Sequence, residues 1–299
     1  MKNKKIKLSR EDRLFMVLSY SITLFCAIVC VVPFLMLVVG SFSNNSRIVI
    51  EGYGLLPKGF TFEAYNVIFK QSDKILKAYQ ITILVTLIGT VSGVLITTMG
   101  GYVLSRKDFK YRYAVSMFVY FTSIFSGGMI PSFLIFTKVL HLYDNIWALI
   151  LPMLTSFFNV FLYRNFANGI PDSLVEAGKL DGASDLGVFF KIVLPISKPA
   201  VATIALFTAL AYWNDWYRSS IYIRNQDLIM LQYLLHKMML NTSSALREAS
   251  GSLDVSLVDL PTETVKLATA VVTTGPVLLF YPFAQKYFVG GITIGSVKG

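Results

Sequence analysis

The chain has 299 residues, of which 55% are hydrophobic and only 15% are charged, with a formal net charge of +10 at pH 7. Soluble domains carry roughly 25% charged residues, so the composition excludes an ordinary soluble domain and favours a membrane protein. The positive charge would also suit a nucleic-acid-binding protein, but the basic residues gather in alternate polar segments between apolar runs, as a membrane topology signal requires. We therefore expect no nucleic-acid partner.

Six apolar runs follow one another along the chain. A bilayer core of about 30 Å needs roughly 20 helical residues, and five runs reach that length without a charge. The fifth in order reaches it only by including Asp215. The sequence predicts an all-α membrane protein with six transmembrane helices, at about residues 14–42, 78–105, 113–137, 145–166, 199–218 and 266–288.

The topology follows from the basic residues. They concentrate in residues 1–13, between the second and third predicted spans, and between the fourth and fifth. These segments share one side, and the positive-inside rule makes that side cytoplasmic. Residues 1–13 are then a cytoplasmic N-terminus, residues 14–299 are expected to form a single transmembrane domain, and both termini face the cytoplasm.

Two of the predicted spans contain glycines that affect packing. Gly89 and Gly93 in the second span have the GxxxG spacing that allows close helix contact. The third span is interrupted by Gly127, Gly128 and Pro131. The interruption is either a break beside a cavity or a kink filled by neighbouring helices, and the sequence leaves both open.

A polar segment, residues 167–198, connects the fourth and fifth spans. Pro171 suits a first helical turn, and Asp172 and Ser173 can accept hydrogen bonds from free backbone N–H groups. We expect a short helix over residues 173–183, with carboxylates for polar contacts and small residues for close approach to a partner. The alternative is an elbow that only connects two spans, and the two interpretations are compatible.

Recognisable catalytic and metal-binding motifs are absent from the sequence. It contains no P-loop, no H-E-x-x-H and no G-x-S-x-G motif, and its two histidines, His141 and His236, lie far apart. We expect a chain that is not an enzyme and that binds neither a metal nor a cofactor.

The connecting segment reads Phe-Ala-Asn-Gly-Ile-Pro-Asp-Ser-Leu-Val-Glu-Ala-Gly-Lys-Leu-Asp-Gly-Ala-Ser over residues 166–184, with Ile-Val-Leu-Pro at 192–195. It resembles the EAA loop of ABC importer permeases. Residues 105–109, 126–131, 213–216 and 281–291 look like carbohydrate importer permeases, closest to those for oligosaccharides and polysaccharides. One departure is Gly178, where the motif usually has alanine; glycine lowers helix propensity by about 1 kcal/mol, which would loosen this turn.

The resemblance implies a coupling helix, between the fourth and fifth spans, that docks in a cleft of an ATP-hydrolysing subunit. The residues carried over to this contact are Ser173, Glu176, Ala177, Gly178, Asp181, Gly182, Ala183, Leu194 and Pro195. The implied partners are a second homologous permease, two ATP-binding subunits that hold ATP and Mg²⁺, an extracytoplasmic solute-binding protein, a glycan substrate and the lipid bilayer. The implied location is a bacterial cell membrane.

A substrate path is expected where ionisable, amide and aromatic residues lie within spans, because such groups are costly in lipid and suit sugar hydroxyls and ring faces. The candidates are Tyr120, Ser123, Asn159, Trp213, Asn214, Asp215 and Trp216. Alternatively, the two tryptophans belong to an interfacial aromatic belt with Asp215 in headgroup water.

Two other classes of function compete with an ATP-driven importer. An ATP-independent secondary transporter or channel would carry coupling residues in several spans or repeats across two halves, whereas this sequence has one carboxylate near a membrane end and no repeat. A purely structural or receptor-like membrane protein would not need the docking segment.

Overall fold

The computed structural model describes residues 9–70, 72–240 and 263–276. Regular structure in these ranges is helical, apart from one isolated bridge between Ser43 and Phe60. This confirms the predicted all-α class. The chain divides into two compact units, whose described parts are residues 9–70, 239–240 and 263–272 in the first and 72–238 and 273–276 in the second. The single transmembrane domain over residues 14–299 stays a prediction.

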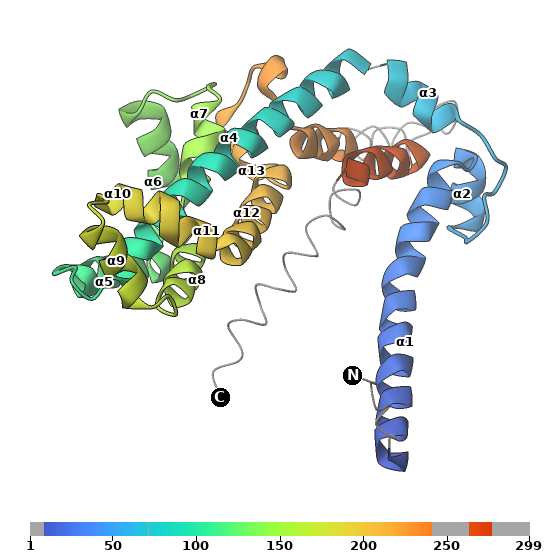
Figure 1. Ribbon diagram of the computed structural model, residues 1–299. Coiled ribbons are helices and arrows are strands. Elements are labelled where there is room, and N and C mark those ends of the chain that lie inside the picture. Colours follow the sequence, from blue (N-terminus) through green and yellow to red (C-terminus); the bar gives the residue numbers. More distant parts are fainter. Residues whose placement is uncertain (1–8, 71, 241–262, 277–299) are drawn as a thin grey trace. The chain divides into compact units, whose positions relative to one another are not determined.

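The long helix of the first unit is α1, Arg10–Ser41 (Figure 1). The Asp12 carboxylate accepts a hydrogen bond from the Ser9 N–H at 3.0 Å and so satisfies one free donor at the helix start. Apolar side chains cover α1 on all sides and are exposed in this chain, Leu14 and Phe25 among them. A helix that is apolar all round needs lipid or a partner around it, and α1 is long and apolar enough to cross a membrane.

Two short helices follow in the first unit. α2, Asn45–Glu51, begins where the Asn44 side chain accepts hydrogen bonds from two backbone N–H groups, and α3 is Glu63–Lys70. The Asn45 side chain accepts a hydrogen bond from the N–H of Glu263 at 3.0 Å, at the start of a helix over residues 263–276. The predicted sixth span begins in this helix, and its residues 277–288 lie outside the described residues.

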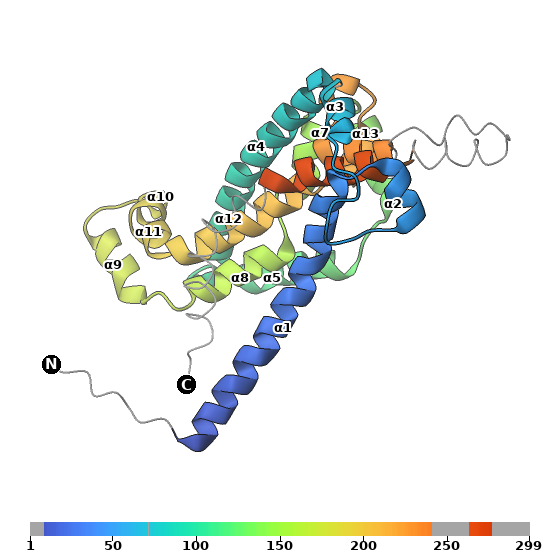
Figure 2. The same ribbon diagram turned by 90° about the vertical axis from the view of Figure 1, so that its right-hand side faces the viewer.

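The second unit is built around α4, Ser72–Ser105, which packs against α8, Phe157–Ala167, and α12, Lys198–Trp213 (Figures 1 and 2). The glycines at GxxxG spacing make these contacts. A Cβ atom on Gly89 would collide with the ring of Tyr212, and one on Gly93 would lie 3.4 Å from Cγ2 of Thr208, both residues of α12. The predicted close helix contact is therefore confirmed.

The third predicted span is two helical pieces. α5, Arg112–Ile124, ends before the glycines, and α6, Met129–Leu134, continues into the π-helix η1, Ile135–Val139. The two pieces are bent by 112°, and Gly128 between them has a φ of +87°. The interruption is thus a break and not a gentle kink, because the backbone there takes a conformation that favours glycine.

The fourth and fifth predicted spans are also divided. The fourth consists of α7, Trp147–Ile150, the 3-10 turn η2, Leu151–Met153, and α8, with a 48° bend. In the fifth, the helix α12 ends at Trp213. Beyond it the Asn214 side-chain amide donates to the carbonyl of Leu210 at 2.9 Å, and the N–H of Asp215 donates to the carbonyl of Tyr212 at 3.2 Å, which tightens the last turn. Asp215 therefore lies beyond the end of α12 and outside any helix. Further short helical segments of this unit are α13, Tyr217–Tyr222, η4, Gln226–Leu228, and residues 231–238 of a helix that reaches residue 240.

Within the described residues, α1 and residues Asp73–Ser105 of α4 are each long and apolar enough to cross a membrane. The bent pairs raise the number to as many as five if each pair counts as one span. The third such pair joins Asp185–Ile196 to α12 at 86°. The arrangement with six spans stays a prediction.

Candidate functional site

The predicted coupling segment contains a short helix with one buried side. This helix, α9, is Asp172–Leu180 and starts after Pro171. Val175 and Gly178 are its buried residues. Val175 packs in a cluster with Tyr163, Val188 and other apolar side chains of the second unit. Figure 2 shows α9 at the same end of α12 as the next short helices, α10 and α11.

Gly178 allows α9 to lie close to the chain that follows it. A Cβ atom at this position would come within 2.6 Å of Cδ1 of Ile192 and 3.4 Å of Cγ2 of Val188. Ile192 belongs to the π-helix η3, Phe189–Val193. Although glycine has low helix propensity, here it serves a tight contact, so the departure from alanine has a packing reason that the sequence did not reveal.

The opposite side of α9 is exposed. Ser173, Glu176, Ala177 and Leu180 share this side, because they are spaced at i, i+3, i+4 and i+7. Leu180 has 88% of its surface exposed, the largest fraction of any large apolar residue described as exposed. We call these four residues the α9 outer face. Sequence reasoning selected three of them and missed Leu180, although the helical spacing was visible.

The predicted helix end at Ala183 is wrong, because α9 ends at Leu180. Gly182 has a φ of +83°, a left-handed conformation that a side chain disfavours. The N–H of Gly182 donates to the carbonyl of Lys179 and that of Ala183 to the carbonyl of Gly178, both at 3.0 Å. These two bonds form a Schellman motif, which satisfies the last carbonyl groups of the helix. Asp181 and Gly182 are exposed in the turn, and Ala183 is half-buried.

Three further helical pieces connect this turn to α12. Ser184 accepts a hydrogen bond from the N–H of Gly187 and starts α10, Asp185–Val188, which continues through η3 into α11, Leu194–Ile196. Leu194 is half-buried and Pro195 is exposed. The sharp bend comes after them, at the buried Ser197, whose hydroxyl donates to the carbonyl of Val193 at 2.7 Å.

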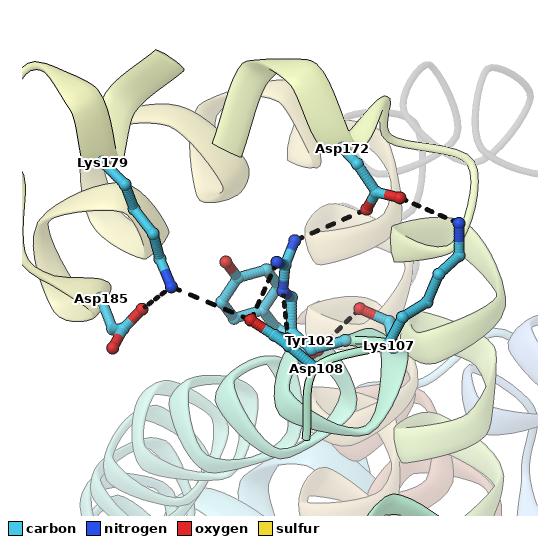
Figure 3. A network of polar contacts seen from close by, with 8 residues as sticks. Tyr102, Lys107, Asp108, Asp172, Lys179 and Asp185 are labelled. Atoms are coloured by element: carbon cyan, nitrogen blue, oxygen red, sulfur yellow. Dashed lines mark hydrogen bonds and ion pairs between the residues drawn. The ribbon is translucent and has the colours of Figure 1, made fainter. Parts of the chain in front are cut away.

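Ion pairs connect the start of α9 to the connection between α4 and α5 (Figure 3). The Asp172 carboxylate lies 2.9 Å from Nζ of Lys107 and 3.6 Å from Nη1 of Arg106. The hydrogen bond from Lys107 lowers the pKa of Asp172. The expected capping role of Asp172 is therefore wrong, because its carboxylate is turned toward these two basic residues.

The end of α9 is held by the same connection. Nζ of Lys179 lies 2.8 Å from Oδ1 of Asp185 and 3.9 Å from Oδ2 of Asp108. Asp108 also accepts from Nε of Arg106 at 3.1 Å, and this bond lowers the pKa of Asp108. Each exposed pair contributes little alone, but together the pairs hold both ends of α9 (Figure 3). A cavity of about 230 Å³ lies beside them, lined by Tyr102, Arg106, Asn168 and Asp172 among others.

A larger cavity, of about 540 Å³, lies between α8 and α12. Of the seven predicted substrate-path residues, only Asn159 lines it, and its side-chain amide donates to the hydroxyl of Thr208 at 3.4 Å. Arg218 also lines the cavity and was missed by sequence reasoning. The sequence did contain a signal for it, because an arginine three residues after Asp215 is spaced to form an ion pair with that carboxylate.

The other six predicted residues lie elsewhere. Asp215 is buried, and its Oδ1 lies 3.3 Å from Nη1 of Arg218, so within this chain the carboxylate is not in water. Trp213 is buried against Ala78 and Leu231. The remaining four are more exposed: Tyr120 beside Phe157, Ser123 bonded to the Tyr120 carbonyl, Asn214 at the end of α12, and Trp216 stacked on His236.

Among the described residues, no group of three or more His, Cys, Asp or Glu side chains is placed to hold a metal ion.

Known proteins resemble this chain over nearly its full length. The family model described as binding-protein-dependent transport system inner membrane component matches residues 89–293. The polygalacturonan/rhamnogalacturonan transport system permease protein YtcP of Bacillus subtilis is 42% identical over 97% of this chain and 100% of its own length. The arabinooligosaccharides transport system permease protein AraQ of the same species is 28% identical, covering 97% and 99%.

A solved structure shows the same fold. One chain in the crystal structure of a bacterial ABC transporter involved in the import of the acidic polysaccharide alginate superposes with a TM-score of 0.80 and 29% sequence identity. The alignment covers 94% of this chain and 99% of that one.

Proposed function

The chain belongs to the family of binding-protein-dependent transport system inner membrane components, within the sugar ABC transporter permeases, and from this membership we propose that it is the membrane-spanning subunit of an ATP-driven glycan importer. The family resemblance predicted from the sequence is confirmed. We propose oligosaccharides or polysaccharide fragments as substrates, in keeping with the relatives, which are named for polygalacturonan, rhamnogalacturonan and arabinooligosaccharides.

The proposal for coupling rests on the two sides of α9. The buried side is fixed to its own chain by Val175 and Gly178, while the outer face presents Ser173, Glu176, Ala177 and Leu180. An exposed leucine beside small residues and one carboxylate fits a hydrophobic cleft with a polar rim on a partner. We assign this face to the contact with an ATP-binding subunit, with Asp181 and Gly182 at its edge.

A docked helix can act as a lever only if the ATP-bound and ATP-free states make different contacts with it. In this chain, a displacement of α9 would reach two parts of the second unit. The Asp172–Lys107 and Lys179–Asp108 pairs lead to the end of α4. The segment through Ala183, Leu194 and Pro195 leads to α12. Movement of both helices would open the substrate path on alternate sides of the membrane.

The other subunits supply what this chain lacks under the proposal. Two ATP-binding subunits hold ATP and Mg²⁺ and carry out hydrolysis, so that this chain needs no catalytic residue and no cofactor of its own. A second homologous permease completes the path, and an extracytoplasmic solute-binding protein delivers the glycan. With six spans in the cytoplasmic membrane of a bacterium, both termini and α9 would face the cytoplasm.

The test uses the full complex, reconstituted in lipid vesicles with its binding protein. Glu176→Lys reverses the only charge on the α9 outer face, and Glu63→Lys, on the exposed start of α3, is the matched control. We expect Glu176→Lys to assemble but to abolish glycan-stimulated ATP hydrolysis and uptake, with the control unaffected. Normal coupling in Glu176→Lys would refute the assignment of this face. Glycan uptake without ATP-binding subunits would refute the importer itself.

A further inference from the structure

The cavity between α8 and α12 lies far from α9. α8 ends at Ala167, just before the α9 segment, and α12 starts at Lys198, just after it. The cavity is lined by the opposite ends of these helices, at Ser156 and Asn159 on one side and Phe207, Thr208 and Ala211 on the other. Its volume, about 540 Å³, falls within the range of roughly 300–1,000 Å³ that is usual for small-molecule sites.

Arg218 brings a positive charge to this cavity. Its side chain is 29% exposed, and Nη1 lies 3.3 Å from Oδ1 of Asp215, whose own side chain is only 5% exposed. The same oxygen accepts from the backbone N–H of Arg218 at 3.3 Å. The Asp215 carboxylate therefore contacts both the guanidinium and the backbone N–H of Arg218 and holds this residue in position.

Most of the donors of this guanidinium have no partner among the residues that the structure describes. A guanidinium has five N–H donors in a planar fork, and within the described residues Asp215 is its only ion-pair or hydrogen-bond partner. The Asp215 carboxylate lies against Nη1, and Arg218, with 29% of its side chain exposed, is part of the cavity wall.

The walls complement a sugar acid. A planar guanidinium binds a carboxylate through two parallel N–H···O bonds. The amide of Asn159 and the hydroxyl groups of Ser156 and Thr208 suit sugar hydroxyl groups, and Phe207, whose ring contacts that of Phe158, belongs to the apolar part of the lining. Because Asp215 balances the charge of Arg218, the site would recognise a carboxylate by hydrogen-bond geometry and not by excess positive charge. Without excess charge, the bound carboxylate could also be released.

We propose that this cavity binds a uronate unit of an acidic glycan, with Arg218 contacting the carboxylate and Asn159 and Thr208 contacting hydroxyl groups. The inference rests on the proposed importer function and narrows its substrate class. Asp215 is a positioning residue in this scheme, since its carboxylate holds Arg218 and has no atom in the cavity wall.

The experiment measures ATP-dependent uptake by the reconstituted complex of two probes, an oligogalacturonate and its neutral methyl ester of the same length. Arg218→Gln alone would leave the buried Asp215 carboxylate without its partner, so the decisive variant is the double substitution Asp215→Asn/Arg218→Gln, which removes both charges. Arg224→Gln, which removes an arginine that stacks on Tyr143, is the control.

We expect the double variant to lose at least about tenfold in uptake rate for the acid at low concentration, as for other charged hydrogen bonds, and to retain uptake of the ester. Equal uptake of both probes by the double variant, at wild-type rates, would show that Arg218 serves only as the partner of Asp215. Loss of uptake of both probes in an assembled complex would show that the Asp215–Arg218 pair is needed for transport in general and not for recognition of a carboxylate. Either result would overturn the inference about the cavity without contradicting the proposed importer function. ATP-dependent uptake of neither probe by the wild type would overturn the inference as well.

Discussion

The contact between Gly178 and Ile192 makes the substitution Gly178→Ala informative about how firmly α9 is held. Alanine in place of glycine within a helix stabilises by about 1 kcal/mol. Here the new methyl group would come within 2.6 Å of Cδ1 of Ile192, the flexible end of that side chain. Turning Ile192 away from its preferred rotamer costs about 0.5–1.5 kcal/mol. We therefore expect the two effects to offset each other, with little net change in the free energy of unfolding.

The matched background is Ile192→Val, which removes the one atom in closest contact. In that background, Gly178→Ala meets only Cγ2 of Val188 at 3.4 Å. It should then stabilise by about 1 kcal/mol, the full helix-propensity difference. The interaction between the two substitutions, about 1 kcal/mol in a double-mutant cycle, is measured by reversible unfolding of the purified chain in mixed micelles. Equal effects of Gly178→Ala in both backgrounds would refute the packing of α9 on η3.

Two further predictions concern the ion pairs that hold α9. Either Lys107→Asp or Asp172→Lys alone should reduce the rate of glycan-stimulated ATP hydrolysis. The reduction should be no more than about fivefold, because the pair is exposed. The double variant with the two charges exchanged should restore the rate, and failure to do so would argue against the pair. The pKa values of Asp108 and Asp172 are lower in the folded chain than the usual 3.8, so these pairs stabilise above that pH and are lost as the pH falls through the lower folded values. Hydrogen exchange of α9, corrected for the intrinsic rate, should therefore not change between pH 8 and pH 5 and should increase only below about pH 3.8; an increase near pH 6 would point to a different group.

The helical class and the location of α9 could be predicted, because both depend on local pattern. Long uncharged runs require helices in lipid, and the proline at 171 and the glycine at 182 mark the two ends of α9. The expected extension to Ala183 was an avoidable error, since a glycine in the C′ position is a common stop signal.

What the sequence could not reveal depends on residues that are far apart along the chain. Asp172 looks like a capping residue until Lys107, 65 positions earlier, is placed beside it. Gly178 looks like a weak point until Ile192 is brought against it. Asp215 follows an apolar run and so looks like a residue within a span. Its burial, however, comes from the fold, and only the buried carboxylate shows that Arg218 has a charged partner.

α12 connects the two sites of the second unit. It starts at the bend after Ser197, next to the α9 segment, and ends beyond Ala211 at the cavity. Its 16 residues span about 24 Å at 1.5 Å per residue. A tilt of about 5° at the bend would therefore displace the far end by about 2 Å. That distance exceeds the length over which a hydrogen bond to Arg218 or Asn159 persists. Under the proposed function, a movement of α9 that tilts α12 by this amount would separate the two walls of the cavity, so that a docked ATP-binding subunit would release a bound sugar without contacting it.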